Sequence, residues 1–260
     1  MHYESTTGLC DEDIDELVGR IGEVLESRGQ SLLGYRLGLR QQVELTLILA
    51  RHNISQALAA DMCGISQPTV SRIWRRIVPL ATHVLAMSGI CLSQAVAQGS
   101  LLLVDGTPIP TGNRPAADKQ VEKANYSGKH HAQCLNVQVA ATTDATLVAV
   151  SDPVPGSRHD SAALSLCGWD TILTGADWIA DTAYTAHGAL TPIKKTPGRE
   201  RLEWEKEFNT AVSSTRAAIE HTIATLKKWK ILSTGYRHRL AELPSIITLI
   251  TKLELYRTGW

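Results

Sequence analysis

The sequence has 260 residues, 43% of them hydrophobic and 20% charged, a composition typical of globular proteins and unlike that of disordered, collagen-like or coiled-coil chains. Its 26 basic residues balance 26 acidic ones, which argues mildly against nucleic-acid binding because a small nucleic-acid-binding domain is often strongly basic. No stretch reaches the ~18 apolar residues of a membrane span, and the five cysteines form no CxxC pair. We therefore expect a reduced cytoplasmic protein without a membrane partner.

The charge is nevertheless unevenly distributed along the chain. In the first 30 residues eight acidic residues outnumber two basic ones, whereas two later groups are basic: Arg72, Arg75 and Arg76, and then Lys227, Lys228, Lys230, Arg237 and Arg239. Contact with phosphate depends on the local field and not on the sum over the whole chain. The basic groups therefore keep a nucleic-acid partner in consideration.

Helical patterns dominate the chain up to a predicted domain boundary near residue 99. Apolar residues recur at helical spacing, and the expected helices are 11–29, 40–51, 55–62, 67–78 and roughly 79–97. The pattern changes at Ser100, where strand-like runs begin. We expect an all-α domain over 1–99 and a mixed α/β domain over 100–260.

The segment 54–77 has the spacing of a helix-turn-helix. A small residue, Ala60, is followed after four residues by Gly64 and after six more by Val70. A helix-turn-helix needs a small residue where its helices touch, a glycine at its tight turn and an apolar residue in its second helix. Ser66 is a candidate N-cap for that helix, and Pro68 is tolerated in its first turn.

The outward face of this second helix is polar and basic. Such side chains can reach base edges and phosphates in a major groove, and they are Gln67, Thr69, Ser71, Arg72, Arg75 and Arg76. The alternative interpretation is a plain helical hairpin whose charged face is only solvated.

The second half of the chain alternates strands and helices. The run 101–104 predicts a buried strand followed by a turn at Asp105-Gly106. Further expected elements are a loop over 110–130, strands at 132–142 and 146–151 joined by a turn at Asp144, a helix starting near Asp160, a short strand ending before Asp181, and helices at 201–228 and 243–257.

Three acidic residues suggest a metal site. Asp105 and Asp181 each follow an apolar strand, and Glu220 lies in a predicted helix. Strand ends and a facing helix can bring remote carboxylates together, and hard divalent cations prefer oxygen ligands. Taken singly, each residue has a simpler interpretation: Asp105 as a turn former, and Arg216 with Glu220 as an exposed helical ion pair.

Five sequence blocks decide between these interpretations. They are VDGTPIP (104–110), YSGKHH (126–131), PGSRHD (155–160), IADTAY (179–184) and RAAIEHTIATLKKWKIL (216–232). In this order the blocks resemble the DDE transposases of bacterial insertion sequences, in the branch similar to Harbinger elements. The resemblance covers nearly the whole chain.

The resemblance implies a ribonuclease H-like fold in which Asp105, Asp181 and Glu220 are catalytic and hold two Mg²⁺ or Mn²⁺ ions. Such an enzyme binds double-stranded DNA at the element's terminal inverted repeats, cleaves it with water and transfers the 3′-hydroxyl end to a target, working as a homodimer or higher oligomer in a bacterial, nucleoid-associated setting. Further motif positions are DNA contacts at Lys129, Arg216 and Lys227 and accessory residues at Tyr126, His130, His159, Asp160 and Tyr184. For Asp160, a helix N-cap is the favoured role.

One departure from the family pattern keeps alternatives open. The family commonly has Asp-Lys-Gly-Tyr after its second strand, where this chain has Asp181-Thr182-Ala183-Tyr184. A domesticated, non-catalytic DNA-binding regulator is one alternative, and a nuclease without strand transfer is another. Trp229, flanked by lysines, is the tryptophan we would test for DNA contact.

Overall fold

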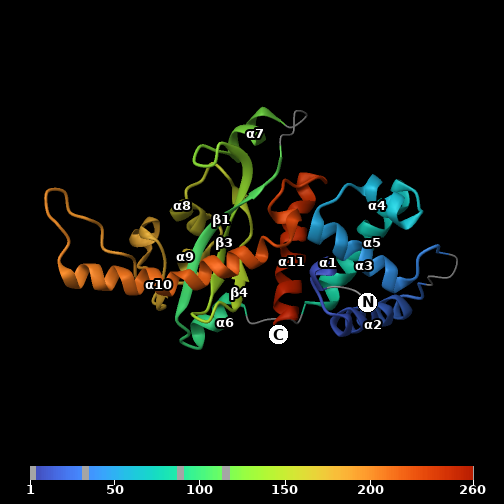
Figure 1. Ribbon diagram of the computed structural model, residues 1–260, viewed down its shortest axis with the longest axis horizontal. Coiled ribbons are helices and arrows are strands. Elements are labelled where there is room, and N and C mark those ends of the chain that lie inside the picture. Colours follow the sequence, from blue (N-terminus) through green and yellow to red (C-terminus); the bar gives the residue numbers. More distant parts are fainter. Residues whose placement is uncertain (1–3, 31–34, 87–90, 113–117, 260) are drawn as a thin grey trace. The chain divides into compact units, whose positions relative to one another are not determined.

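A computed structural model describes residues 4–30, 35–86, 91–112 and 118–259 (Figure 1). The chain forms two compact units. The first joins Met1–Gly89 to Lys227–Trp260, and the second is Ile90–Leu226. These units differ from the expected boundary near residue 99, because the segment from Lys227 onward packs with the N-terminal helices.

The first unit is helical. Its elements are α1 (Glu4–Thr7), α2 (Asp11–Ser27), α3 (Leu39–His52), α4 (Gln56–Cys63), α5 (Gln67–Val84), the 3-10 turns η2 (Lys230–Leu232) and η3 (Leu240–Glu242), and α11 (Leu243–Arg257). The helices expected at 11–29, 40–51, 55–62, 67–78 and 243–257 are thereby confirmed. Part of the helix expected at 79–97 lies outside the described residues. Its ends belong to α5 and to α6 (Leu92–Ala97).

Burial of Trp229 explains why the C-terminal segment joins the first unit. Trp229 is fully buried, its indole N–H donates to the Glu254 carboxylate, and the Arg51 guanidinium lies 5.2 Å above its ring. Gly8 lies so close that a Cβ there would be 2.7 Å from the Trp229 ring. Trp229 is therefore a core residue, and the idea that it contacts DNA is wrong.

Helices α4 and α5 are joined by a tight turn. Gly64 ends α4 in the left-handed conformation (φ 60°, ψ 33°), which glycine adopts at little steric cost. Ala60 and Val70 are buried where the helices meet, Ser66 is the N-cap of α5, and Pro68 lies in its first turn. These are the positions that the spacing of small and apolar residues predicted.

The second unit is built around a mixed sheet (Figure 1). Its strands are β1 (Leu102–Pro110), β2 (Tyr126–Ser127), β3 (Ala132–Ala141), β4 (Leu147–Val150), β5 (Val154–Pro155) and β6 (Trp178–Ile179). The central strand β3 pairs antiparallel with β1 on one side and with β2, β5 and β4 on the other. Strand β6 pairs parallel with the start of β1. The strands expected at 132–142 and 146–151 and their hairpin turn are confirmed.

Strand β1 is longer than the sequence suggested. It pairs with β3 from Leu103 to Pro110, so Asp105-Gly106 lies inside a strand and is not a turn. The N–H of Thr111 bonds to β3, and N–H groups alternate between the two edges of a strand. Pro108 and Pro110 therefore face the edge beyond the short β6, where their missing N–H groups leave no ladder bond unmade.

Helices cover both faces of this sheet. The remaining elements of the unit are α7 (Lys119–Asn125), α8 (Asp160–Leu166), α9 (Trp169–Ile172), η1 (Thr182–His187) and α10 (Glu203–Leu226). The helices expected near Asp160 and over 201–228 are confirmed. In the expected loop over 110–130, Pro110 ends β1 and the chain then forms α7 and β2, while residues 113–117 lie outside the described ranges.

The two faces of the sheet have different partners. One face packs on α6, α8, α9 and η1 around an apolar core that includes Leu102, Val104, Leu164 and Trp178. The C-terminal half of α10 crosses the other face (Figure 1). Within the described ranges no helix has both the length and the apolar character needed to cross a membrane.

Candidate active site

Asp105 lies in the middle of β1 and faces α10. Side chains alternate along a strand, so Asp105 and the following Gly106 belong to opposite faces of the sheet. The Asp105 carboxylate accepts a bond from the Gly106 N–H at 2.9 Å and lies 3.4 Å from Nη2 of Arg216 on α10. Arg216 thus provides the positive charge nearest to this carboxylate.

The electrostatics of Asp105 are those of a buried acid that needs a counter-charge. Burial raises the pKa of Asp105, while Arg216 and the Gly106 N–H lower it. The negative charges of Asp181 and Asp160 raise that pKa further. A half-buried carboxylate whose pKa is raised by two other acids is stabilised by a bound cation. The carboxylate oxygens of this site are therefore suitable ligands for a divalent metal ion.

Asp181 begins η1 directly after β6. Its carboxylate accepts from the Ala183 N–H at 2.7 Å and caps this turn. Because β6 runs parallel to β1 as its neighbour, Asp181 leaves the sheet beside β1, close enough for its charge to act on Asp105. The structure thus places these two predicted acids in one electrostatic neighbourhood.

Glu220 stands apart from the two aspartates. It follows Arg216 by one turn of α10, about 6 Å along the helix axis, towards the β3–β4 hairpin, where Thr222 Oγ1 donates to the Ala145 carbonyl at 2.9 Å. Glu220 is exposed and makes no hydrogen bond or ion pair with a described residue. In the described part of the chain no three His, Cys, Asp or Glu side chains are grouped closely enough to hold a metal.

Two amide side chains of β3 organise the face of the sheet opposite α10. Gln138 Oε1 accepts from the Tyr184 hydroxyl at 2.6 Å, and Asn136 Nδ2 donates to Asp160 Oδ1 at 2.9 Å. Both amides are buried, as is Tyr184. The hydrogen bond from Tyr184 connects η1, which begins after Asp181, to β3. Strand β3 in turn pairs with β1, which carries Asp105.

Gly106 makes this arrangement possible. A Cβ on Gly106 would overlap the Asp160 carboxylate, lying 2.8 Å from its Cγ, and would be 3.1 Å from the Tyr184 hydroxyl. The glycine is required for this close approach and not for a turn, since it lies in the strand. Tyr184 is enclosed so completely that burial, together with the neighbouring acids, raises its pKa, so it acts as a neutral donor.

Asp160 does not have its expected capping role. His159 is the N-cap of α8, without a side-chain cap bond, and Asp160 is the first helical residue. Its carboxylate is only 18% exposed and lies 3.5 Å from Nζ of the exposed Lys129. Asp160 is therefore held by a buried amide on one side and an exposed ammonium on the other.

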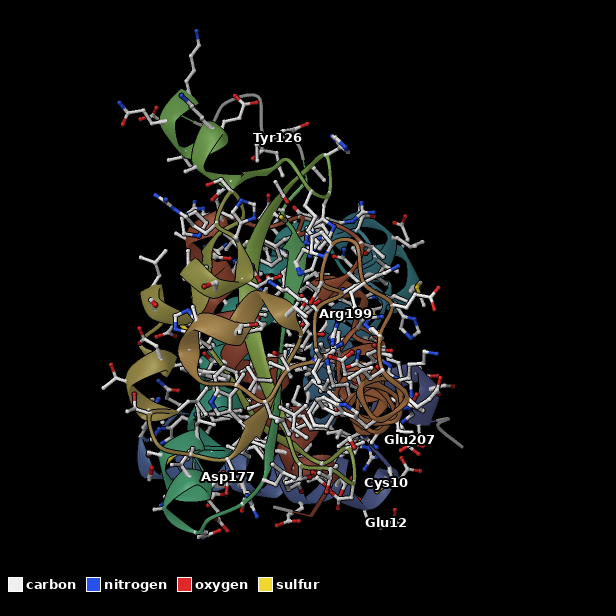
Figure 2. The ribbon with its side chains drawn as sticks, turned by 90° about the vertical axis from the view of Figure 1, so that its left-hand side faces the viewer. Cys10, Glu12, Tyr126, Asp177, Arg199 and Glu207 are labelled. Carbon is white, nitrogen blue, oxygen red and sulfur yellow. The ribbon has the colours of Figure 1, made fainter. Side chains whose placement is uncertain are left out.

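Most of the other motif residues line one cleft beside Asp181. The cleft has a volume of about 500 Å³, and its lining includes Tyr126, Lys129, His130, Arg158, His159 and Asp181. Tyr126 is labelled in Figure 2, close to α7, and Asp177 is labelled near the opposite end of the sheet, where β6 begins. The cleft places three basic or titratable motif residues, Lys129, His130 and His159, next to one of the predicted acids.

Lys227 is separated from the other residues of its motif. Arg216 and Glu220 lie in α10, which ends at Leu226, and Lys227 is the first residue of the chain's return to the first unit. The helix expected over 201–228 thus ends just before Lys227, which follows α10 directly.

The predicted recognition face of α5 is exposed at most of its positions. Gln67, Arg72 and Arg75 are exposed, and Thr69 and Ser71 are partly exposed. Arg76 differs: its guanidinium donates to the Gln42 side chain and lies 4.3 Å above the ring of Tyr35. Arg76 is partly exposed like Thr69 and Ser71, but Gln42 of α3 and Tyr35 already provide its guanidinium with partners inside the unit.

Asn136 and Gln138 were absent from the sequence predictions. Both lie on β3, two residues apart, and so face the same side. The signal that points to them is their polarity, because a strand buried on both faces normally carries apolar residues at such positions. A buried amide needs a hydrogen-bond partner, and here the partners are the motif residues Tyr184 and Asp160.

The second unit thus has a mixed sheet with a half-buried carboxylate, Asp105, on β1 and a second carboxylate, Asp181, directly after the neighbouring parallel strand. The chain belongs to the DDE superfamily endonuclease family, whose match spans residues 104–254. That range includes Asp105, Asp181 and Glu220.

Two relatives agree with the family. The “Putative transposase for insertion sequence element IS112” of Streptomyces albus G is 28% identical over 220 residues, covering 82% of this chain and 80% of that protein. The “Probable transposase for insertion sequence element IS702” of Microchaete diplosiphon is 29% identical over 149 residues, covering 55% of this chain and 51% of that protein. These findings identify a DDE transposase of the insertion-sequence type. No solved structure matches the chain significantly.

Proposed function

We propose that this protein binds the terminal inverted repeats of its element, cleaves the phosphodiester bond at the repeat end with a metal-activated water, and joins the freed 3′-hydroxyl to target DNA. The observation that carries the proposal is the half-buried Asp105 carboxylate, whose pKa is raised by its partial burial and by Asp181 within a chain of the DDE endonuclease family. Two neighbouring acids that are partly withdrawn from water are stabilised by a bound cation, and a metal-dependent nuclease requires such a pair.

The residues that would hold the metal are Asp105, Asp181 and Glu220. When bound, two Mg²⁺ or Mn²⁺ ions supply an activated nucleophile and stabilise the leaving oxygen. Arg216 lies 3.4 Å from Asp105 and offsets its charge while DNA is absent. Once DNA is bound, the same guanidinium is available to a backbone phosphate, since Arg forms bidentate contacts with phosphate oxygens.

Two further parts of the proposal concern architecture. The sheet order with α8 and α10 on opposite faces supports a ribonuclease H-like core of the Harbinger branch. The α4–α5 pair, with its glycine turn and exposed polar face, supports a helix-turn-helix in which α5 enters the major groove. We also propose a homodimer or higher oligomer on DNA, because two element ends must be cut together.

The alternatives are a DNA-binding regulator without catalysis and a nuclease without strand transfer. Thr182 and Ala183 favour the first, since they replace the Lys and Gly that the family commonly has beside the second acid. Both residues lie in η1, and Ala183 N–H still bonds to Asp181, so the turn that presents this acid is intact.

The test is cleavage of a duplex that carries the element's terminal repeats, in Mg²⁺ or in EDTA, for the wild type and Asp105→Asn. Metal-dependent nicking at the repeat end that Asp105→Asn abolishes supports the proposal. Pre-nicked ends incubated with target DNA then report strand transfer: joined products support a transposase, and their absence supports the nuclease. Sequence-specific binding without nicking in any metal favours the regulator.

A further inference from the structure

The segment Ser233–Arg239, here called the return segment, lies against the helices that we propose bind DNA. Asn53 at the end of α3 holds its start: Asn53 Nδ2 donates to Thr234 Oγ1 at 2.8 Å and to the Gly235 carbonyl at 2.9 Å. Asn53 is buried and adopts the left-handed conformation at the C-cap of α3. The start of the segment is thus anchored by a fixed amide.

The other end of the return segment is anchored by a ring stack. His238 stacks on Trp74 of α5 with centroids 4.9 Å apart and planes 5° from parallel. Trp74 is buried, and the ring of the buried Tyr236 lies 5.6 Å from the His238 ring. His238 therefore turns inward onto α5 and fixes the backbone on either side of it.

A chain of hydrogen bonds continues from His238 to the start of α5. Gln56 Nε2 lies 3.5 Å from His238 Nδ1, and Gln56 Oε1 accepts from Gln67 Nε2 at 2.6 Å. Gln67 is the first residue of α5 and one of the proposed base-contacting residues. The return segment consequently runs beside the N-terminal half of the recognition helix.

Arg237 and Arg239 flank His238 and are both exposed. Arg239 is the N-cap of η3, and the chain bends at His238 between the two arginines. In the described part of the chain neither arginine forms a hydrogen bond or an ion pair through its side chain. Arg40 is different, since it is paired with Asp11 and Glu44.

We propose that Arg237 and Arg239 form a second DNA contact, which grips the phosphate backbone beside the groove that α5 enters. The ligand is the phosphodiester backbone and not a base, because the segment flanks the helix and does not extend it. Exposed guanidinium groups on a fixed backbone suit phosphate oxygens. This inference depends on the proposed DNA binding by α5. The DNA-binding surface of the first unit would then consist of two segments that are far apart in the sequence, α5 and the return segment.

The experiment measures DNA affinity of the full chain against salt concentration, with a fluorescent duplex bearing the terminal repeat and EDTA present so that no cleavage occurs. Each phosphate contact contributes about 0.9 to the slope of log affinity against log salt. The double variant Arg237→Ala/Arg239→Ala is expected to lower that slope by about 1.8 and to weaken repeat and unrelated DNA equally.

A matched control separates a local contact from a loss of net charge. Arg20→Ala/Arg28→Ala removes the same charge from α2 and its C-cap, and we expect its slope to stay near that of the wild type. A second pair of variants tests the stacking of His238 on Trp74. His238→Ala should lower the slope of log affinity against log salt, although both arginines are still present. His238→Phe keeps a ring on Trp74 and should retain the wild-type slope. Thermal melts confirm that each variant is folded.

The outcomes separate this inference from the function on which it rests. If Arg237→Ala/Arg239→Ala matches the α2 control while Arg72→Ala still weakens repeat binding, the return segment makes no DNA contact and the proposed recognition helix stands. If Arg72→Ala also has no effect, the helix-turn-helix proposal fails together with the inference.

Discussion

The two units place their polar residues in opposite ways. On the α5 face the polar side chains point outward, and Arg72 and Arg75 are exposed. In the sheet unit the key polar groups point inward, where Asn136, Gln138 and Tyr184 are buried. An outward charge is available to a large external anion, whereas an inward polar group is positioned by its neighbours. The first arrangement suits binding of DNA, and the second suits the positioning of reacting atoms.

The largest expected effect comes from mutations that separate DNA binding by the first unit from catalysis by the second. We expect Asp181→Asn to reduce metal-dependent nicking by roughly a thousandfold, equivalent to about 4 kcal/mol of transition-state stabilisation, while repeat binding in EDTA stays unchanged. Arg72→Ala should do the reverse: affinity falls, and nicking of saturated duplex persists. Equal loss of both activities in both variants would show that the units do not divide the work in this way.

Gly106 offers the next largest effect. Gly106→Ala places a Cβ 2.8 Å from Asp160 Cγ and 3.1 Å from the Tyr184 hydroxyl, and such overpacking costs about 1–3 kcal/mol of stability. We expect a lower melting temperature together with strongly reduced nicking. Gly19→Ala in α2 is the control, because nothing lies within 4 Å of its Cβ position. Wild-type nicking by Gly106→Ala would show that the approach of Asp160 and Tyr184 is irrelevant to catalysis.

Tyr184→Phe tests whether the inward hydrogen bonds position the acids or only stabilise the fold. It leaves the Gln138 carbonyl oxygen without its donor, at a cost of about 1–3 kcal/mol, and we expect the Mg²⁺ concentration for half-maximal nicking to rise because η1 is less firmly held. Tyr256→Phe removes a comparable bond, to Glu16 in the first unit, and should lower stability without changing the Mg²⁺ dependence. Identical Mg²⁺ curves for both variants would assign Tyr184 a purely structural role.

The smallest effect concerns stability against pH without metal. Burial raises the folded-state pKa of Asp105 above its unfolded value, so the folded state binds more protons between the two values. Stability contributed by this group is present below the unfolded pKa and is lost as pH rises through the folded pKa. In EDTA, Asp105→Asn should therefore melt higher than the wild type above that window. A wild type that is the more stable one throughout would mean that Arg216 fully compensates the buried charge.

Elements with a strong periodic pattern were predictable from sequence. The apolar spacing of α2 and the small-residue spacing around Gly64 depend on neighbours close in the chain, and the structure has both. The strand predicted at 101–104 was too short, because Asp-Gly and two prolines suggest a turn. In the structure β1 continues, because it pairs with β3 and its other edge is open beyond β6. The pairing residues of β3 are about 30 positions away in the sequence, so no local pattern indicates them.

The site was predictable only in part for the same reason. Resemblance pointed to Asp105 and Asp181, but not to Gln138 and Asn136, whose roles depend on partners in η1 and α8. Trp229 is likewise buried in the first unit through its contacts with Gly8, Arg51 and Glu254. These residues are far apart in the sequence, and no local pattern connects them. The DNA contact considered for Trp229 was wrong because its distant partners bury it in the core.

The central claim, that Asp105, Asp181 and Glu220 form one metal site, is tested most directly by Fe²⁺-dependent hydroxyl-radical cleavage of the protein chain on terminal-repeat DNA, since the radicals cut backbone close to the bound iron. We predict cuts near all three residues that disappear when excess Mg²⁺ displaces the iron. Cuts near Asp105 and Asp181 alone, with Glu220→Gln nicking as the wild type does, would contradict the claim and leave a site of two aspartates.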